Sequence, residues 1–179
     1  LWEHLYPMFS KCFEWQGVRT QGTYPDCDML PIGRISKLCS YHGKQNRMSN
    51  FTKAEHYTLM SLWGIFGSPL MIGGNMPEND DFTLSLLTNS EYMHMHKTIK
   101  NSRQLARKET DGKGYIIWDG ENNENRYIAL FNTDDKEITL NTLQATNIDT
   151  TGAYDIWNKT VTESSEYTIL PHGAVLLKL

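Results

Sequence analysis

The sequence is poor in cysteine and proline, with 3 cysteines and 6 prolines among 179 residues. Cys12, Cys27 and Cys39 show no C-x-x-C spacing, and their odd number leaves at least one thiol unpaired. This excludes a small protein whose fold depends on a framework of disulfides. Without C-x-x-C spacing, the sequence also lacks the paired cysteines typical of a structural zinc site. No metal or cofactor is expected.

Long hydrophobic runs and an excess of basic charge are also missing. Apolar runs such as Leu70–Ile72 and Ala174–Leu177 are far shorter than the roughly 20 residues that a bilayer requires, so no membrane span is expected. The 17 Lys and Arg against 21 Asp and Glu give a net charge of −4. Nucleic acid is therefore not an expected partner, because binding phosphate needs a basic patch. The 11% of aromatic residues supplies enough surface to bury for an ordered fold.

The first half, residues 1–97, reads as helices that alternate with short strands. A helix is predicted to open at about Pro7, and Thr52 and Glu55 form a capping box for a second helix that Pro69 ends. A third helix starts at Asp80 or Asp81 and continues to Tyr92. The apolar runs Met29–Ile32 and Leu70–Ile72 are predicted to be buried strands, and residues 34–50 a long loop. Alternating helices and strands predict a parallel sheet with crossover helices, of which this half holds only a part.

The second half, residues 98–179, has a period of two instead. Short runs rich in β-branched and aromatic residues are separated by polar turns such as Asp119–Gly120 and Trp157–Lys159, a pattern typical of an antiparallel sandwich. The predicted strands are Tyr115–Trp118, Tyr127–Phe131, Glu137–Leu140, Tyr154–Trp157, Tyr167–Leu170 and Ala174–Leu177.

Four segments resemble glycoside hydrolase family 27, the α-galactosidase (melibiase) family. Tyr24–Gly33 (YPDCDMLPIG) is similar to the family's D-x-D-M-L-x-I-G stretch, and Ser61–Gly73 (SLWGIFGSPLMIG) to its S-L-W-x-I-x-x-S-P-L pattern. Leu84–Glu91 and Pro171–Leu177 extend the resemblance over nearly the whole chain. Two linked motifs in the same order are fairly specific, whereas either motif alone is weak.

The resemblance implies an α/β plus all-β fold. Residues 1–97 would be the last two β/α units of a (β/α)8 TIM barrel, and residues 98–179 a C-terminal antiparallel β-sandwich. A complete barrel needs about 250 residues, so this chain is too short to hold one. The implied parent is a retaining glycosidase, α-galactosidase-like, that cleaves terminal α-linked galactose or a related sugar from oligosaccharides or glycoconjugates by double displacement.

Retaining glycosidases use two carboxyl groups, one as the nucleophile and one as the acid/base. The family's K-x-D and R-x-x-D-D-x-W motifs, which carry both, do not occur in this sequence. No catalytic residue is assigned, and the chain alone is expected to be inactive. The resemblance instead places Asp28 in the sugar pocket, Met29 in its wall and Asp26 in a structural or supporting role. A carboxylate at Asp28 can accept hydrogen bonds from sugar hydroxyls and raise the donor's pKa by like-charge proximity.

This sequence departs from the family at Tyr24, Pro25 and Cys27, because the commoner pattern reads W-N-D-P-D where Tyr24–Asp28 stands. Other candidates have simpler interpretations. His94 and His96 could bind a metal, but their side chains diverge on a helix and a solvated helix end is the better reading. Four aromatic residues could stack on sugars, although alternating aromatics are more often sandwich core: Trp118, Tyr127, Tyr154 and Trp157.

Two other function classes stay open, a non-catalytic carbohydrate-binding protein and a structural β-domain that covers the barrel. The expected partner is a carbohydrate substrate, and the oligomeric state is left open between a monomer and a homo-oligomer. The family's usual location gives an extracytoplasmic expectation, whether secreted, periplasmic or lysosome-like.

Overall fold

The computed structural model describes residues 1–18, 20, 22–35 and 47–179. The helices, with one 3-10 turn, are α1 (Trp2–Leu5), α2 (Pro7–Glu14), α3 (Lys53–Phe66), η2 (Met76–Glu78), α4 (Asp81–Leu87), α5 (Ser90–Thr98) and α6 (Thr142–Thr146). The strands are β1 (Arg34–Ile35), β2 (Arg47–Met48), β3 (Lys100–Thr110), β4 (Lys113–Glu121), β5 (Arg126–Asn132), β6 (Ile138–Asn141), β7 (Tyr154–Asp155), β8 (Thr160–Val161), β9 (Glu166–Ile169) and β10 (Ala174–Lys178). Within the described ranges, no helix is both long and apolar enough to cross a bilayer.

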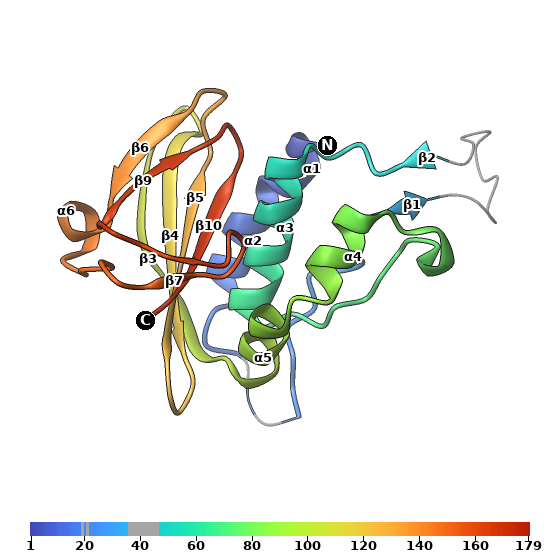
Figure 1. Cartoon of the computed structure of the whole chain (residues 1–179), viewed down its shortest axis with the longest axis horizontal. Coiled ribbons are helices and arrows are strands. Elements are labelled where there is room, and N and C mark those ends of the chain that lie inside the picture. Colours follow the sequence, from blue (N-terminus) through green and yellow to red (C-terminus); the bar gives the residue numbers. More distant parts are fainter. Residues whose placement is uncertain (19, 21, 36–46) are drawn as a thin grey trace.

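An antiparallel sheet of order β3-β4-β5-β10-β7-β8 dominates the second half of the chain (Figure 1). A separate antiparallel pair, β6 and β9, lies beside it. Each of the six runs predicted from the period of two contains a strand, so the antiparallel prediction is confirmed. The observed β7 is shorter than its run, because the chain turns at Ile156.

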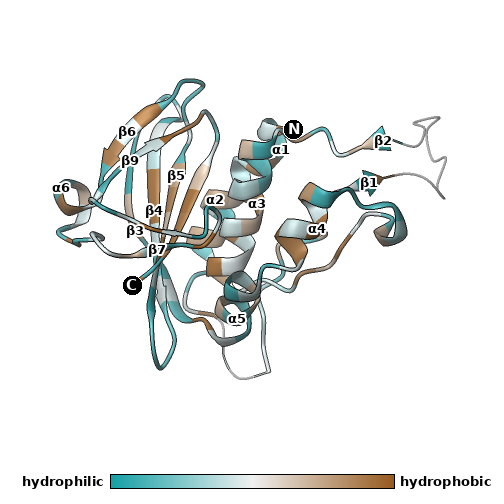
Figure 2. Ribbon diagram, viewed as in Figure 1, coloured by the Kyte–Doolittle hydropathy of each residue, from teal (hydrophilic) through white to brown (hydrophobic). Residues whose placement is uncertain are grey.

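Both faces of this sheet are covered, and alternate residues of each strand explain how. On β4 and β5, Trp118 and Ala129 belong to the core shared with the helices, whereas Ile117, Ile128 and Leu130 belong to the core shared with β6 and β9. Burial on both faces explains why the apolar runs are nearly continuous rather than alternating with polar residues. Figure 2 shows these hydrophobic strands at the centre of the sheet.

Helices α2 and α3 pack directly on the sheet, and α3 lies between the sheet and α4 (Figure 1). Phe9 of α2 meets Phe131 of β5 edge to face, with ring centroids 5.0 Å apart. Phe66 of α3 meets Trp118 of β4 in the same way at 5.9 Å. The helical half and the sheet therefore share one continuous hydrophobic core.

Two predicted helix starts are confirmed, and one predicted helix end is wrong. α2 begins at Pro7, and the reciprocal hydrogen bonds of the Thr52–Glu55 capping box open α3. α3 ends at Phe66 rather than at Pro69, because Gly67 adopts a left-handed conformation with φ of 77° and caps the helix.

The third predicted helix is two helices in the structure. Asp80 caps α4 as expected, with its side chain accepting a hydrogen bond from Thr83 N. The chain then breaks at Thr88, and the side chain of Asn89 accepts a hydrogen bond from Tyr92 N at 3.0 Å to start α5. A second N-cap residue thus ends the continuous helix that the apolar periodicity predicted.

The two strands predicted in the first half are reduced to a single parallel bridge between Leu30 and Ile72. Leu30 N donates to Met71 O at 2.7 Å, and Gly73 N donates to Leu30 O at 3.0 Å. The predicted loop over residues 34–50 contains the short strands β1 and β2 at its ends. Its middle, with Cys39, lies outside the described residues.

Two predictions in the second half need correction. Asp119 and Gly120 were expected to form a turn, but both are buried inside β4. The strand β3 was not predicted, because most of its side chains are polar and it forms an edge of the sheet. The turn predicted at Trp157–Lys159 is present.

Candidate functional site

The residues expected to line a sugar site, Asp26, Asp28 and Met29, lie in one loop and are exposed. Asp26 Oδ1 accepts a hydrogen bond from Asp28 N at 2.8 Å, and Asp28 Oδ1 accepts one from Met29 N at 2.7 Å. Asp28 has a φ of 74°, in the left-handed region that aspartate tolerates better than most residues. The two carboxylates therefore shape the turn and keep acceptor positions free toward solvent.

Three contacts with distant parts of the chain hold this loop. Trp63, which is nearly buried on α3, donates from Nε1 to the carbonyl oxygen of Asp28 at 3.0 Å. Cys27 N donates to the hydroxyl of Ser68 at 2.9 Å. The parallel bridge of Leu30 to Ile72 fixes the end of the loop. The backbone on both sides of the Asp28 side chain is thus fixed while the carboxylate itself remains accessible.

An apolar surface accompanies the carboxylates. The side chains of Met29 and Met71 are 57% and 50% exposed, which is high for large apolar residues. Gly73 lies against Met29, since a Cβ at Gly73 would be 3.5 Å from Met29 Cβ. Acceptors for hydroxyl groups beside an exposed apolar wall are complementary to a sugar ring, which presents hydroxyl groups and an apolar face.

The two histidines that were expected at a solvated helix end differ. His94 is exposed as expected, whereas His96 is half-buried, with its Nε2 2.8 Å from Ser68 O. In the parts of the chain that the structure describes, no cluster of three or more His, Cys, Asp or Glu side chains could hold a metal ion. Trp118 and Tyr127 are fully buried in the core and cannot stack on a sugar.

Trp157 is also accounted for by packing. Its indole Nε1 donates to the Ser61 hydroxyl at 2.8 Å, and its ring packs against Tyr57 and Tyr92. The ammonium nitrogen of Lys178 lies over the ring of Tyr154, 5.3 Å from the ring centroid. All four candidate aromatic residues therefore belong to, or pack against, the core that the sheet shares with the helices: Trp118, Tyr127, Tyr154 and Trp157.

Sequence reasoning missed the residues that anchor the loop. Trp63 was noted as part of the Ser61–Gly73 motif, and its hydrogen bond from Nε1 to Asp28 O was not predicted. Ser68 was noted only as part of a motif, although its hydroxyl accepts from Cys27 N. The two motifs that carry the family resemblance are thus in contact, and their joint occurrence in the sequence was the available signal that they belong together.

Comparison with known proteins connects this loop and the sheet behind it to one family. Residues 112–179 match the model of the α-galactosidase C-terminal β-sandwich domain. The structure of a family 27 β-L-arabinopyranosidase from Geobacillus stearothermophilus aligns with the whole chain at 37% identity and a TM-score of 0.84. Over its whole length, the chain is similar to the C-terminal region of glycoside hydrolase family 27 proteins.

Other relatives show a similar likeness. The structure of a candidate α-N-acetylgalactosaminidase from Bacillus halodurans covers the whole chain at 33% identity and a TM-score of 0.85. A protein of Aspergillus niger named "Probable alpha-galactosidase D" is 26% identical over 191 aligned residues, which include 99% of this chain. This chain spans 26% of that relative, and 42% and 44% of the two solved structures.

Proposed function

We propose that this chain is the C-terminal part of a retaining glycosidase that removes a terminal α-linked galactose, or a related sugar, from oligosaccharides or glycoconjugates. The observation that carries the proposal is the Asp26–Met29 loop, in which an exposed carboxylate lies on a fixed backbone beside exposed methionines. The similarity of the whole of this chain to a part of each relative supports it.

Residues 1–97 are proposed to complete a (β/α)8 barrel with the preceding part of the parent protein. The parallel bridge between Leu30 and Ile72 supports this, because adjacent barrel strands are parallel. Helix α3 lies between these two segments in sequence, as the crossover helix of a β/α unit does. The Asp26–Met29 loop precedes the bridge and would contribute to the sugar pocket of the completed barrel.

In this proposal Asp28 accepts hydrogen bonds from sugar hydroxyls, Met29 forms part of the pocket wall, and Asp26 supports the turn. The nucleophile and the acid/base come from the preceding part of the protein. The 179-residue chain by itself is therefore expected to show no hydrolysis of aryl α-galactosides. Turnover by the isolated chain that is lost on mutation of one of its own carboxylates would contradict this assignment.

The test in the full-length protein is Asp28→Asn. Asparagine also adopts positive φ, and its Oδ1 can keep the hydrogen bond from Met29 N, so the change removes the charge with little effect on the backbone. Loss of a hydrogen bond to a charged group costs about 1.5–3 kcal/mol, which corresponds to a roughly 10- to 150-fold fall in kcat/KM. An unchanged kcat/KM would overturn the role of Asp28.

Asp111→Asn is the matched control. Asp111 is also exposed and also has a positive φ, of 52°, but it lies in the turn between β3 and β4. It should leave kcat/KM unchanged. Asp28→Asn should also lower the pH at which activity falls on the alkaline side, since removing a nearby negative charge lowers the pKa of the protonated donor.

The sugar itself is proposed from the relatives. Aryl α-galactoside, aryl β-L-arabinopyranoside and aryl α-N-acetylgalactosaminide should be compared, because the names of the homologous proteins cover these three sugars. We expect measurable hydrolysis of at least one of the three, with the highest kcat/KM for the α-galactoside. An extracytoplasmic location is part of the proposal and can be tested by cell fractionation.

A further inference from the structure

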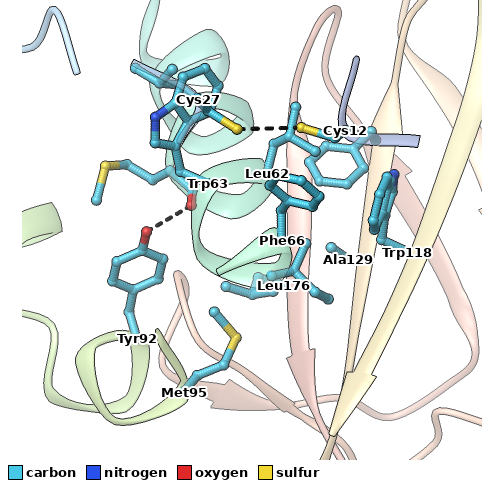
Figure 3. Packing of buried hydrophobic residues seen from close by; sticks show 14 of the residues in the cluster. Cys12, Cys27, Leu62, Trp63, Phe66, Tyr92, Met95, Trp118, Ala129 and Leu176 are labelled. Carbon is cyan, nitrogen blue, oxygen red and sulfur yellow. Dashed lines mark hydrogen bonds between the residues drawn. The ribbon is translucent and has the colours of Figure 1, made fainter. Parts of the chain in front are cut away.

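Two buried cysteines meet behind the Asp26–Met29 loop. Cys12 lies on α2 and Cys27 lies between Asp26 and Asp28, fifteen positions later in the sequence. Their sulfur atoms are 3.5 Å apart, and both side chains are almost fully buried (Figure 3). The dashed line between the two sulfurs in Figure 3 marks this contact.

We propose that Cys12 and Cys27 form a disulfide that attaches the Asp26–Met29 loop to helix α2. The sulfurs need to approach by about 1.5 Å to reach bonding distance. Cys12 is on a regular helix, whereas Cys27 is in a segment without helix or strand, so the approach requires adjustment mainly on the loop side. This inference goes beyond the proposed glycosidase function and does not depend on it.

The bond would connect the loop to the main core. Phe9, on the same helix as Cys12, packs against Phe131 of the sheet. The loop is otherwise held by hydrogen bonds from Trp63 and to Ser68 and by the Leu30–Ile72 bridge. A covalent attachment at Cys27 restrains the backbone directly between the two aspartates.

The chemistry is thiol–disulfide exchange with a small disulfide such as oxidised glutathione. The Cys27 thiolate attacks one sulfur of the oxidant, forms a mixed disulfide and releases one glutathione thiolate. Cys12 then loses its proton to solvent and attacks the sulfur of Cys27, which releases the second glutathione. Two cysteine thiols are oxidised and one glutathione disulfide is reduced to two thiols.

The surroundings of the two sulfurs support this order. The hydrogen bond between them lowers the pKa of Cys27 and raises the pKa of Cys12, and burial raises the pKa of Cys12 further. Cys27 is therefore the sulfur that is more readily ionised. Its two sequence neighbours, Asp26 and Asp28, are exposed, whereas Cys12 lies on the buried face of helix α2.

The test is peptide mapping of the full-length protein after equilibration in glutathione buffers from reducing to oxidising. Free thiols are blocked with N-ethylmaleimide in denaturant without reductant, and the protein is digested with trypsin. Cleavage after Lys11, Arg19, Arg34 and Lys37 places Cys12, Cys27 and Cys39 on three different peptides. We expect the peptides of residues 12–19 and 20–34 to be joined, with a mass two hydrogens below their sum.

Matched variants make the result specific. Cys39→Ser should retain the joined peptides, whereas Cys12→Ser and Cys27→Ser should lose them. Oxidation should raise the unfolding temperature of Cys39→Ser by several degrees, because a cross-link restricts the unfolded chain. If Cys12 and Cys27 both react with N-ethylmaleimide in the most oxidising buffer, or if Cys27 is joined to Cys39, the proposal is wrong. The wild-type mapping gives this answer even where a serine variant folds poorly.

Discussion

The packing of α2 on the sheet can be tested by making the same substitution at two positions of that helix. Phe9 is fully buried against Phe131, whereas Phe13, one turn later, is 46% exposed. Phe9→Ala removes a buried ring and leaves a cavity, at a cost of about 3–5 kcal/mol in the free energy of unfolding. Phe13→Ala loses the burial of about half a ring and gains helix propensity, for a net cost of about 0.5 kcal/mol.

The assay is urea unfolding followed by tryptophan fluorescence and by far-UV circular dichroism. Because the helices and the sheet share one core, both probes should report the same midpoint in the wild type and in each variant. The difference between the two variants should exceed about 2 kcal/mol. Equal costs at the two positions, or separate transitions for helix and sheet, would refute the shared core.

Three further predictions concern other parts of the fold. Thr52→Ala removes the N-cap of α3 and should cost about 1 kcal/mol in thermal or urea unfolding, whereas Thr52→Ser should cost little. Hydrogen bonds from the Ser165 hydroxyl and Thr151 N lower the pKa of Asp149 to about 2, so its contribution to stability is complete above its ordinary value of 3.8 and is lost as the pH falls through about 2. Asp149→Asn should therefore flatten the fall of unfolding temperature between these pH values. Gly114→Ala should destabilise by about 2 kcal/mol or more in urea, because its Cβ would overlap Lys108 O.

The antiparallel strands could be predicted from the sequence because their residues are buried on both faces. In runs such as Tyr127–Phe131, side chains that face the helices alternate with side chains that face β6 and β9, so the runs are apolar throughout. β3 was missed because it lies at the edge and its side chains are mainly charged or polar. The Asp111–Gly112 pair, with φ of 52° and 76°, was the available signal for the β3–β4 hairpin.

The candidate site could be predicted only in part. The resemblance assigned Asp28 to a sugar pocket, Met29 to its wall and Asp26 to a supporting role. The structure shows that the three residues lie in one exposed loop, and their role in binding sugar stays a prediction. The anchors of the loop could not be read from local pattern, because Trp63 is 35 positions from Asp28 and Ser68 is 41 positions from Cys27. Such contacts depend on how α3 packs across the chain, which periodicity alone does not give.

The most direct test of the central claim is a crystal structure of the full-length protein with the sugar that it releases. We expect a carboxylate oxygen of Asp28 within about 2.5–3.0 Å of a sugar hydroxyl and the Met29 side chain against the ring. A sugar bound elsewhere, with the Asp28 carboxylate facing only solvent, would contradict the assignment of this loop to the sugar pocket.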